Sequence, residues 1–139
     1  MLTRANRLPL LILALTLAVL FYRLFLGETF FWGLPSLQFY PWREYAFDLL
    51  RHGQLPLWNS YNGAGAPLLA NYQSALLYPL NWFGLILPLA WSMSVTAVLH
   101  LFIAGWGMWK FTGKLGLPIL GRGISTLSFA LTGYLVARL

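Results

Sequence analysis

The chain has 139 residues, of which 59% are hydrophobic, 17% are aromatic and only 9% are charged. Soluble domains carry about 25% charged residues because their surface must be solvated. This composition argues against a soluble domain and indicates an integral membrane protein. The net charge of +6 does not indicate nucleic-acid binding, because the cations lie at the ends of apolar segments and not in one basic patch.

The first element in chain order is an apolar segment over residues 8–26. At a rise of 1.5 Å per residue it would reach about 28 Å, close to the thickness of the hydrocarbon core. Arg4 and Arg7 precede it, as basic residues precede the apolar part of a signal peptide. No small-residue cleavage site follows, however. The segment therefore predicts an uncleaved transmembrane span.

Two further spans are predicted at 89–109 and 119–137, with a short basic loop between them. Lys and Arg are enriched on the cytoplasmic side of membrane proteins. The chain's three acids all fall between the first two spans, so we predict a cytoplasmic N-terminus and an extracytoplasmic loop over 27–82. The predicted fold class is thus all-α, with three transmembrane helices. The basic residues on the predicted cytoplasmic side are Arg4, Arg7, Lys110, Lys114 and Arg122.

The long loop contains its own pattern. A loop of this length without secondary structure would be unusual. Residues 42–52 alternate polar and apolar positions at helical spacing, with Trp42 and Tyr45 on the apolar side and Gly53 as a stop signal. We predict a short amphipathic helix that lies flat at the membrane interface.

Amide and aromatic side chains follow this helix, nearly free of charge. Asn and Gln carry both a donor and an acceptor, which match sugar hydroxyls, and aromatic faces can stack on pyranose rings. The alternative is an aromatic belt at the headgroup level, with amides satisfying irregular backbone. Arg43 and Arg51 could bind a lipid phosphate through bidentate hydrogen bonds, or equally a phospholipid headgroup. The candidate substrate-binding residues are Gln38, Arg43, Arg51, Trp58, Asn59, Asn71, Tyr72 and Gln73.

Several segments in order, 38–43 (QFYPWR), 53–59 (GQLPLWN), 63–73 (GAGAPLLANYQ) and 131–134 (LTGY), resemble the YfhO-type family of bacterial membrane proteins. The resemblance covers essentially the whole chain. It implies a longer polytopic protein of the bacterial cytoplasmic membrane, of which this chain is an N-terminal piece. The family is similar to the GT-C glycosyltransferases, which transfer a sugar from a polyprenyl-phosphate donor outside the cytoplasmic membrane.

The resemblance also implies a catalytic acid on the first external loop. The family places an Asp a few residues before the position of Gln38, whereas residues 32–38 of this chain contain no acid. Three candidate catalytic acids remain: Glu28, Glu44 and Asp48. Each could act as a general base or help to hold a divalent metal ion, the one candidate cofactor. Glu44 and Asp48 share a helical face, but an ion pair between Asp48 and Arg51 is a simpler explanation of their spacing.

The sequence therefore predicts the N-terminal portion of a membrane glycosyltransferase-like protein. Its expected partners are membrane lipid, a polyprenyl-phosphate-linked sugar and the remainder of the polytopic chain, and no activity is expected from this fragment alone. The alternatives are a transport protein or a glycan- or lipid-binding protein on the same scaffold, and a structural assembly subunit.

Overall fold

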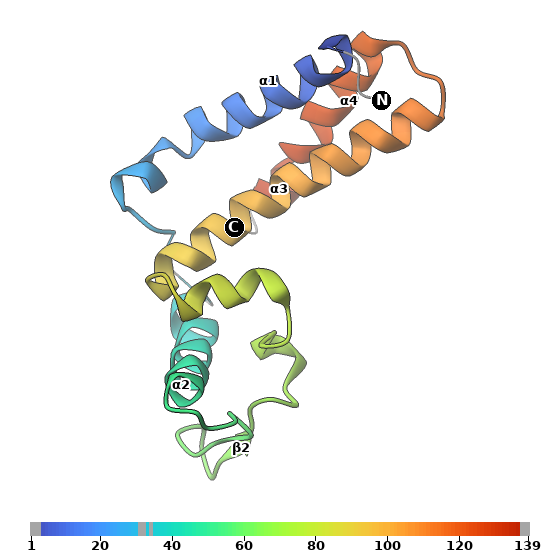
Figure 1. Ribbon diagram of the computed structural model, residues 1–139. Helices are drawn as coiled ribbons and strands as arrows, with labels where there is room; N and C mark the ends of the chain where they lie inside the picture. Colours follow the sequence, from blue (N-terminus) through green and yellow to red (C-terminus); the bar gives the residue numbers. More distant parts are fainter. Residues whose placement is uncertain (1–3, 31–32, 34, 137–139) are drawn as a thin grey trace. The chain divides into compact units, whose positions relative to one another are not determined.

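Helices make up most of the chain. The computed structural model describes residues 4–30, 33 and 35–136, which form two compact units (Figure 1). Unit 1 combines Met1–Gly27 with Ala97–Leu139, and unit 2 is Glu28–Thr96. Helix α3 (Leu89–Lys114) begins in unit 2 and ends in unit 1.

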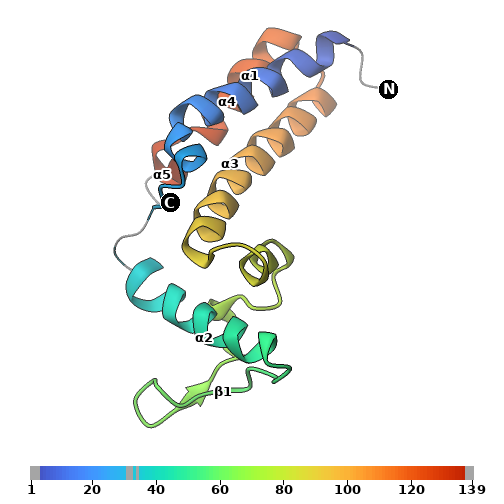
Figure 2. The same ribbon diagram turned by 60° about the vertical axis from the view of Figure 1, so that its left-hand side comes forward.

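The described residues of unit 1 form helices and the turns between them, with no β-strand. Helices α1 and α4 contact each other, and both lie alongside the second part of α3 (Figures 1 and 2). Besides α3, the helices of this unit are α1 (Arg4–Leu20), a 3-10 helix (Tyr22–Leu26), α4 (Ile119–Ala130) and α5 (Gly133–Val136).

The core of unit 1 is apolar and tightly packed. Leu13 and Leu17 of α1 pack against Leu101 of α3 and Ala130 of α4. A Cβ at Gly105 would overlap the side chain of Leu13 and crowd Ala130. The glycine therefore permits the close helix approach on which this packing depends.

Unit 2 contains one long helix, α2, and a small antiparallel sheet. In the sheet Trp58 faces Pro67 and Asn59 faces Ala66. The remaining segments are short turns of helix, so most of the unit is irregular chain held by side-chain contacts. Its elements are a π-helical turn (Pro35–Phe39), α2 (Tyr40–Arg51), β1 (Trp58–Asn59), β2 (Ala66–Pro67), two 3-10 helices (Tyr72–Ser74 and Pro79–Leu85) and the first turns of α3.

Helix α2 organises this unit. Pro41 lies in its first turn, where a missing N–H costs nothing. The helix ends at Arg51, and Gly53 follows with φ +74°, a left-handed conformation that glycine adopts without strain. Ala46 and Phe47 are fully buried and form the centre of a core that also contains Leu68, Leu76 and Leu89.

The prediction of three transmembrane helices is wrong. Among the described residues, one helix is long and apolar enough to cross a membrane, namely α3, which runs from Leu89 to Lys114 instead of the predicted 89–109. The apolar part of α1, Leu8–Leu20, reaches only about 20 Å. The predicted first span over 8–26 fails because the α-helix ends at Leu20 and the chain continues as a 3-10 helix.

The predicted third span over 119–137 fails for a similar reason. Helix α4 ends at Ala130, and a separate short helix begins at Gly133; residue 137 lies outside the described residues. A continuous apolar segment need not form one continuous helix, because hydrophobicity does not report where helical hydrogen bonding stops. The small sheet in unit 2 also departs from the predicted all-α class.

The predicted interfacial helix at 42–52 is present as α2, but its apolar side is occupied. Its buried side chains pack into the core of unit 2. Tyr45 and Trp42 pack against the same core and are half-buried. The pattern of an amphipathic helix was therefore correct, while the surface that the helix covers is protein.

We expect Phe47→Ala to destabilise unit 2 by about 3–5 kcal/mol, because it removes a fully buried ring and leaves a cavity. The same substitution at Phe83, whose side chain is 43% exposed, is the matched control and should cost clearly less. Thermal unfolding of the detergent-solubilised chain, followed by circular dichroism, measures both. Equal losses in the two variants would contradict the assignment of Phe47 to the core.

Candidate functional site

A groove of about 590 Å³ lies along one side of α2 in unit 2. One wall comes from the start of α2 and the turn before it, and the other from β1 and the turn that follows. Aromatic rings, two carboxylates and two amides therefore converge on one space. The lining residues are Leu37, Tyr40, Pro41, Trp42, Glu44, Tyr45, Asp48, Asn59, Tyr61 and Asn62.

Two of the four aromatic residues that line the groove form a ring pair. The ring of Tyr61 meets that of Tyr45 edge-to-face, with centroids 5.2 Å apart and planes at 88°. This is a preferred geometry for aromatic pairs. Tyr45 is half-buried against the core, whereas Tyr61 is 81% exposed. Tyr61 thus has a supported edge and a large surface open to a ligand.

The turn after β1 positions Tyr61. The side-chain Oδ1 of Asn59 accepts a hydrogen bond from the backbone N–H of Tyr61 at 2.9 Å, which is the geometry of an Asx turn. Asn59 is itself buried, so the turn is anchored. Next to it, a Cβ at Gly65 would overlap the indole of Trp58. Only glycine lets the hairpin fold back this closely beneath the ring.

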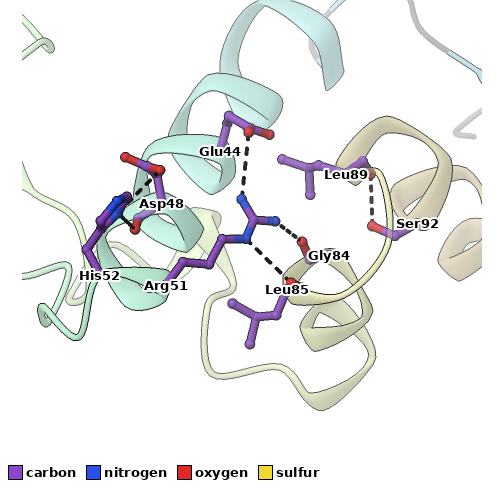
Figure 3. Close-up of polar contacts among 8 residues, drawn as sticks. All are labelled: Glu44, Asp48, Arg51, His52, Gly84, Leu85, Leu89 and Ser92. Carbon is purple, nitrogen blue, oxygen red and sulfur yellow. Dashed lines mark hydrogen bonds and ion pairs between the residues drawn. The ribbon is translucent and has the colours of Figure 1, made fainter.

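The carboxylate of Glu44 lies between two donors. The hydroxyl of Tyr40, one helical turn earlier, hydrogen-bonds to Glu44. Burial raises the pKa of Tyr40, and the charge and hydrogen bond of Glu44 raise it further. On the other side, Nη1 of Arg51 lies 3.9 Å from Oε1 of Glu44 (Figure 3). The negative charge at this wall of the groove is therefore partly compensated within the protein.

Arg51 is a structural residue of the turn before α3. Its Nη2 donates to the carbonyl of Gly84 at 2.8 Å and its Nε to the carbonyl of Leu85 at 3.4 Å (Figure 3). Pro88 has no N–H and so cannot donate to either carbonyl. The guanidinium supplies hydrogen-bond donors that the turn lacks. It also connects α2 to the end of the 3-10 helix Pro79–Leu85.

Asp48 is the more accessible acid of the groove. Its side chain is 59% exposed, and its Oδ1 lies 3.6 Å from Nδ1 of His52. The same ring nitrogen lies 2.8 Å from the Asp48 carbonyl. The pairing differs from the sequence-based alternative, because Arg51 pairs with Glu44 and not with Asp48. Asp48 therefore keeps most of its hydrogen-bonding capacity for a ligand.

Arg43 is also engaged by the main chain. Its Nε donates to the carbonyl of Ser74 at 3.1 Å, and burial lowers its pKa. Ser74 is fully buried and its hydroxyl donates to the carbonyl of Asn71 at 2.7 Å. Both predicted phosphate-binding arginines thus hydrogen-bond to backbone carbonyls of unit 2.

The predicted amide residues gather at a separate place. Gln38 Nε2 lies 3.4 Å from Gln73 Oε1, and Gln73 Nε2 lies 3.4 Å from the hydroxyl of Tyr72. Asn71 caps the 3-10 helix by accepting the Gln73 N–H. These four described residues contact one another and do not line the groove.

The structure therefore brings together Glu44, Asp48 and Asn59 from the predicted set. The exposed Glu28 and the ring of Trp58 lie outside the groove lining. Sequence reasoning missed several groove residues, although helical spacing could have found two of them. Tyr40 lies one helical turn before Glu44. Tyr45 follows Glu44 directly and lies one turn before Asp48. The missed residues are Leu37, Tyr40, Pro41, Trp42, Tyr45, Tyr61 and Asn62.

The arrangement can hydrogen-bond and stack on a neutral ligand, and it can accept a proton at Asp48. Within the described residues, no group of three or more His, Asp and Glu side chains gathers where it could hold a metal ion. Comparisons with models of protein families, with curated proteins and with solved structures found no match to this chain.

We expect Arg51→Gln to destabilise unit 2 by about 2 kcal/mol, because the buried Gly84 carbonyl loses a charged donor. His52→Ala, which removes an exposed polar contact with Asp48, should cost less than about 1 kcal/mol. Chemical denaturation of the two variants measures the difference. If Arg51→Gln were as mild as His52→Ala, the turn before α3 would not depend on this guanidinium.

Proposed function

We propose that the α2 groove binds a neutral saccharide, and that the chain is the sugar-binding portion of a membrane-associated glycosyltransferase-like protein. One observation supports this above all: three tyrosines, a tryptophan, two carboxylates and two amides line a single groove. The resemblance to the YfhO-type family supports the same class of substrate. The candidate span α3 supports a membrane location.

The chemistry of the groove fits a sugar better than a phosphate. Its lining contains acids and amides but no Lys, Arg or His, and a phosphate would be repelled by the two carboxylates. Sugar hydroxyls can donate to Asp48 and Glu44 and exchange hydrogen bonds with Asn62. The open ring of Tyr61 offers an apolar face to the C–H side of a pyranose.

In the glycosyltransferase reading, Asp48 is the base. Its carboxylate takes the proton of the acceptor hydroxyl while that oxygen bonds to the anomeric carbon of the donor sugar. The bond between this carbon and the polyprenyl phosphate breaks, and the phosphate, which the groove itself does not bind, leaves with the electron pair. Glu44, held by Tyr40 and Arg51, positions the sugar and does not take the proton.

The second candidate is a glycan-binding protein without catalysis. The observation that favours it is the compensation of Glu44 by Arg51 and Tyr40, which leaves one carboxylate for proton transfer. The same groove then recognises a glycan, and the described residues perform no bond-breaking step.

We expect the solubilised chain to bind neutral methyl glycosides, and Tyr61→Ala to weaken binding about 5- to 10-fold, because the exposed ring is lost. Isothermal titration with a panel of methyl hexopyranosides measures this. Tyr22→Ala removes a 54% exposed tyrosine of unit 1 and should leave the affinity unchanged. Absence of binding to every glycoside, or equal losses in both variants, would refute the saccharide proposal.

Asp48→Asn separates the two candidates. In the complete protein with a polyprenyl-phosphate sugar, an enzyme should lose transfer by at least about 100-fold while glycoside affinity changes little. A glycan-binding protein should show no transfer before or after the substitution. Transfer that survives Asp48→Asn would exclude Asp48 as the base.

A further inference from the structure

The charges of this protein divide unequally between its two units. Unit 2 contains all three acids, Glu28, Glu44 and Asp48, and two arginines. Unit 1 contains no acid at all, so its cations have no carboxylate side chain of their own unit to pair with. The basic residues of unit 1 are Arg4, Arg7, Arg23, Lys110, Lys114, Arg122 and Arg138.

Three of these cations lie near the end of α3 and the start of α4. Lys110 and Lys114 lie one turn apart at the end of α3, and Arg122 lies in the first turn of α4. The guanidinium carbon of Arg122 stands 3.6 Å from the ring centroid of Trp109, and its Nη2 donates to the Trp109 carbonyl at 3.2 Å. We call Lys110, Lys114 and Arg122 the cationic end of unit 1.

Trp109 and the space left by Gly113 hold Arg122 in place. A Cβ at Gly113 would overlap its guanidinium, so the glycine provides the space in which the group lies. Its Nε is buried and has no hydrogen-bond partner among the described residues, as is true of the Trp109 Nε1 and the Thr126 Oγ1 nearby on the same helices. A half-buried cation with an unused donor is costly unless an anion compensates it.

The surroundings of the cationic end have the composition of a membrane interface. Trp, Lys and Arg are enriched where a spanning helix reaches the headgroups, and α3 is the helix long enough to span. The Lys110 ammonium lies 4.1 Å from the ring centroid of Trp106. Exposed apolar side chains stand among the cations, with Phe111 at 58% and Leu120 at 78% exposure.

The start of α1 reaches the same end of unit 1. Pro9 lies 3.7 Å from the position of a Cβ at Gly123, near the start of α4. Figure 2 shows the first turns of α1 beside α4 and the end of α3. The backbone of α1 thus brings Arg4 and Arg7, in its first two turns, to the end that already carries three cations.

We propose that the cationic end of unit 1 binds the phosphate of an anionic phospholipid headgroup. Arg122, fixed by Trp109, donates to the phosphate, and the flexible lysines close around it. The exposed apolar side chains beside them contact the acyl chains. A lipid fits better than a soluble phosphate because it matches both the charge and the apolar surface, and several cations fit a charged headgroup layer better than one partner carboxylate. This site is independent of the saccharide groove.

The test uses the full chain in nanodiscs that contain phosphatidylcholine with increasing fractions of phosphatidylglycerol. Native mass spectrometry counts the phosphatidylglycerol molecules that remain bound after release. We expect Arg122→Gln to lower retention about 5-fold and Lys110→Gln with Lys114→Gln about 25-fold, since each cation near an anionic surface contributes about one factor of five. Both lysines are exposed, so the double variant should fold normally even if Arg122→Gln does not.

Arg23→Gln is the matched control, because Arg23 belongs to unit 1 but follows the far end of α1; its retention should equal that of the unaltered chain. Equal retention in the lysine double variant would overturn the proposal. Displacement of the lipid by millimolar inorganic phosphate would show a phosphate site and not a lipid site. Loss of a co-purifying acidic protein from Arg122→Gln, with lipid retention unchanged, would assign Arg122 to a protein partner and likewise overturn it.

Discussion

The burial of Phe47 determines how unit 2 is arranged. Because this ring and Ala46 are fully buried, α2 cannot rotate about its axis without exposing them. Glu44 and Asp48, one turn apart, are then directed away from the core, while Tyr40 packs against it. The same constraint positions the groove residues. Tyr45 packs against the core, and its ring contacts that of Tyr61. The packing of an apolar core thus fixes the direction of the polar side chains that carry the proposed chemistry.

A missing backbone donor shapes the electrostatics of the groove. Pro88 leaves the carbonyls of Gly84 and Leu85 without an N–H from its position, and Arg51 donates to both. The same guanidinium faces Glu44 at 3.9 Å. A proline that starts a helix is therefore linked, through one arginine, to the charge of a groove carboxylate. Asp48 has no such link, which is why the two acids of one helical face have different surroundings and different proposed roles.

The amphipathic pattern of a short segment predicted its helix better than long apolar segments predicted transmembrane spans. The helix at 42–52 could be predicted because its polar and apolar positions alternate at helical spacing and Gly53 ends it. The spans at 8–26 and 119–137 could not, because an apolar sequence does not reveal that the α-helix ends at Leu20 and Ala130. The groove combines both cases. Glu44 and Asp48 were predicted from their spacing, whereas Tyr61 and Asn62 reach the groove through a hairpin turn whose direction depends on Asn59 and Gly65.

The unequal division of charge gives the net charge of +6 a physical meaning. The sequence places cations at the ends of apolar segments, and the division into units places seven of the nine Lys and Arg residues, but none of the three acids, in unit 1. Spread over a soluble surface, such an excess would be screened by water and salt. Beside Trp109, where Nε of Arg122 is buried and has no hydrogen-bond partner within the part of the chain that the structure describes, the charge is screened much less. The end of α3 is therefore where an anion would compensate the most positive charge. In unit 2, the groove acids are proposed to hydrogen-bond to a neutral ligand.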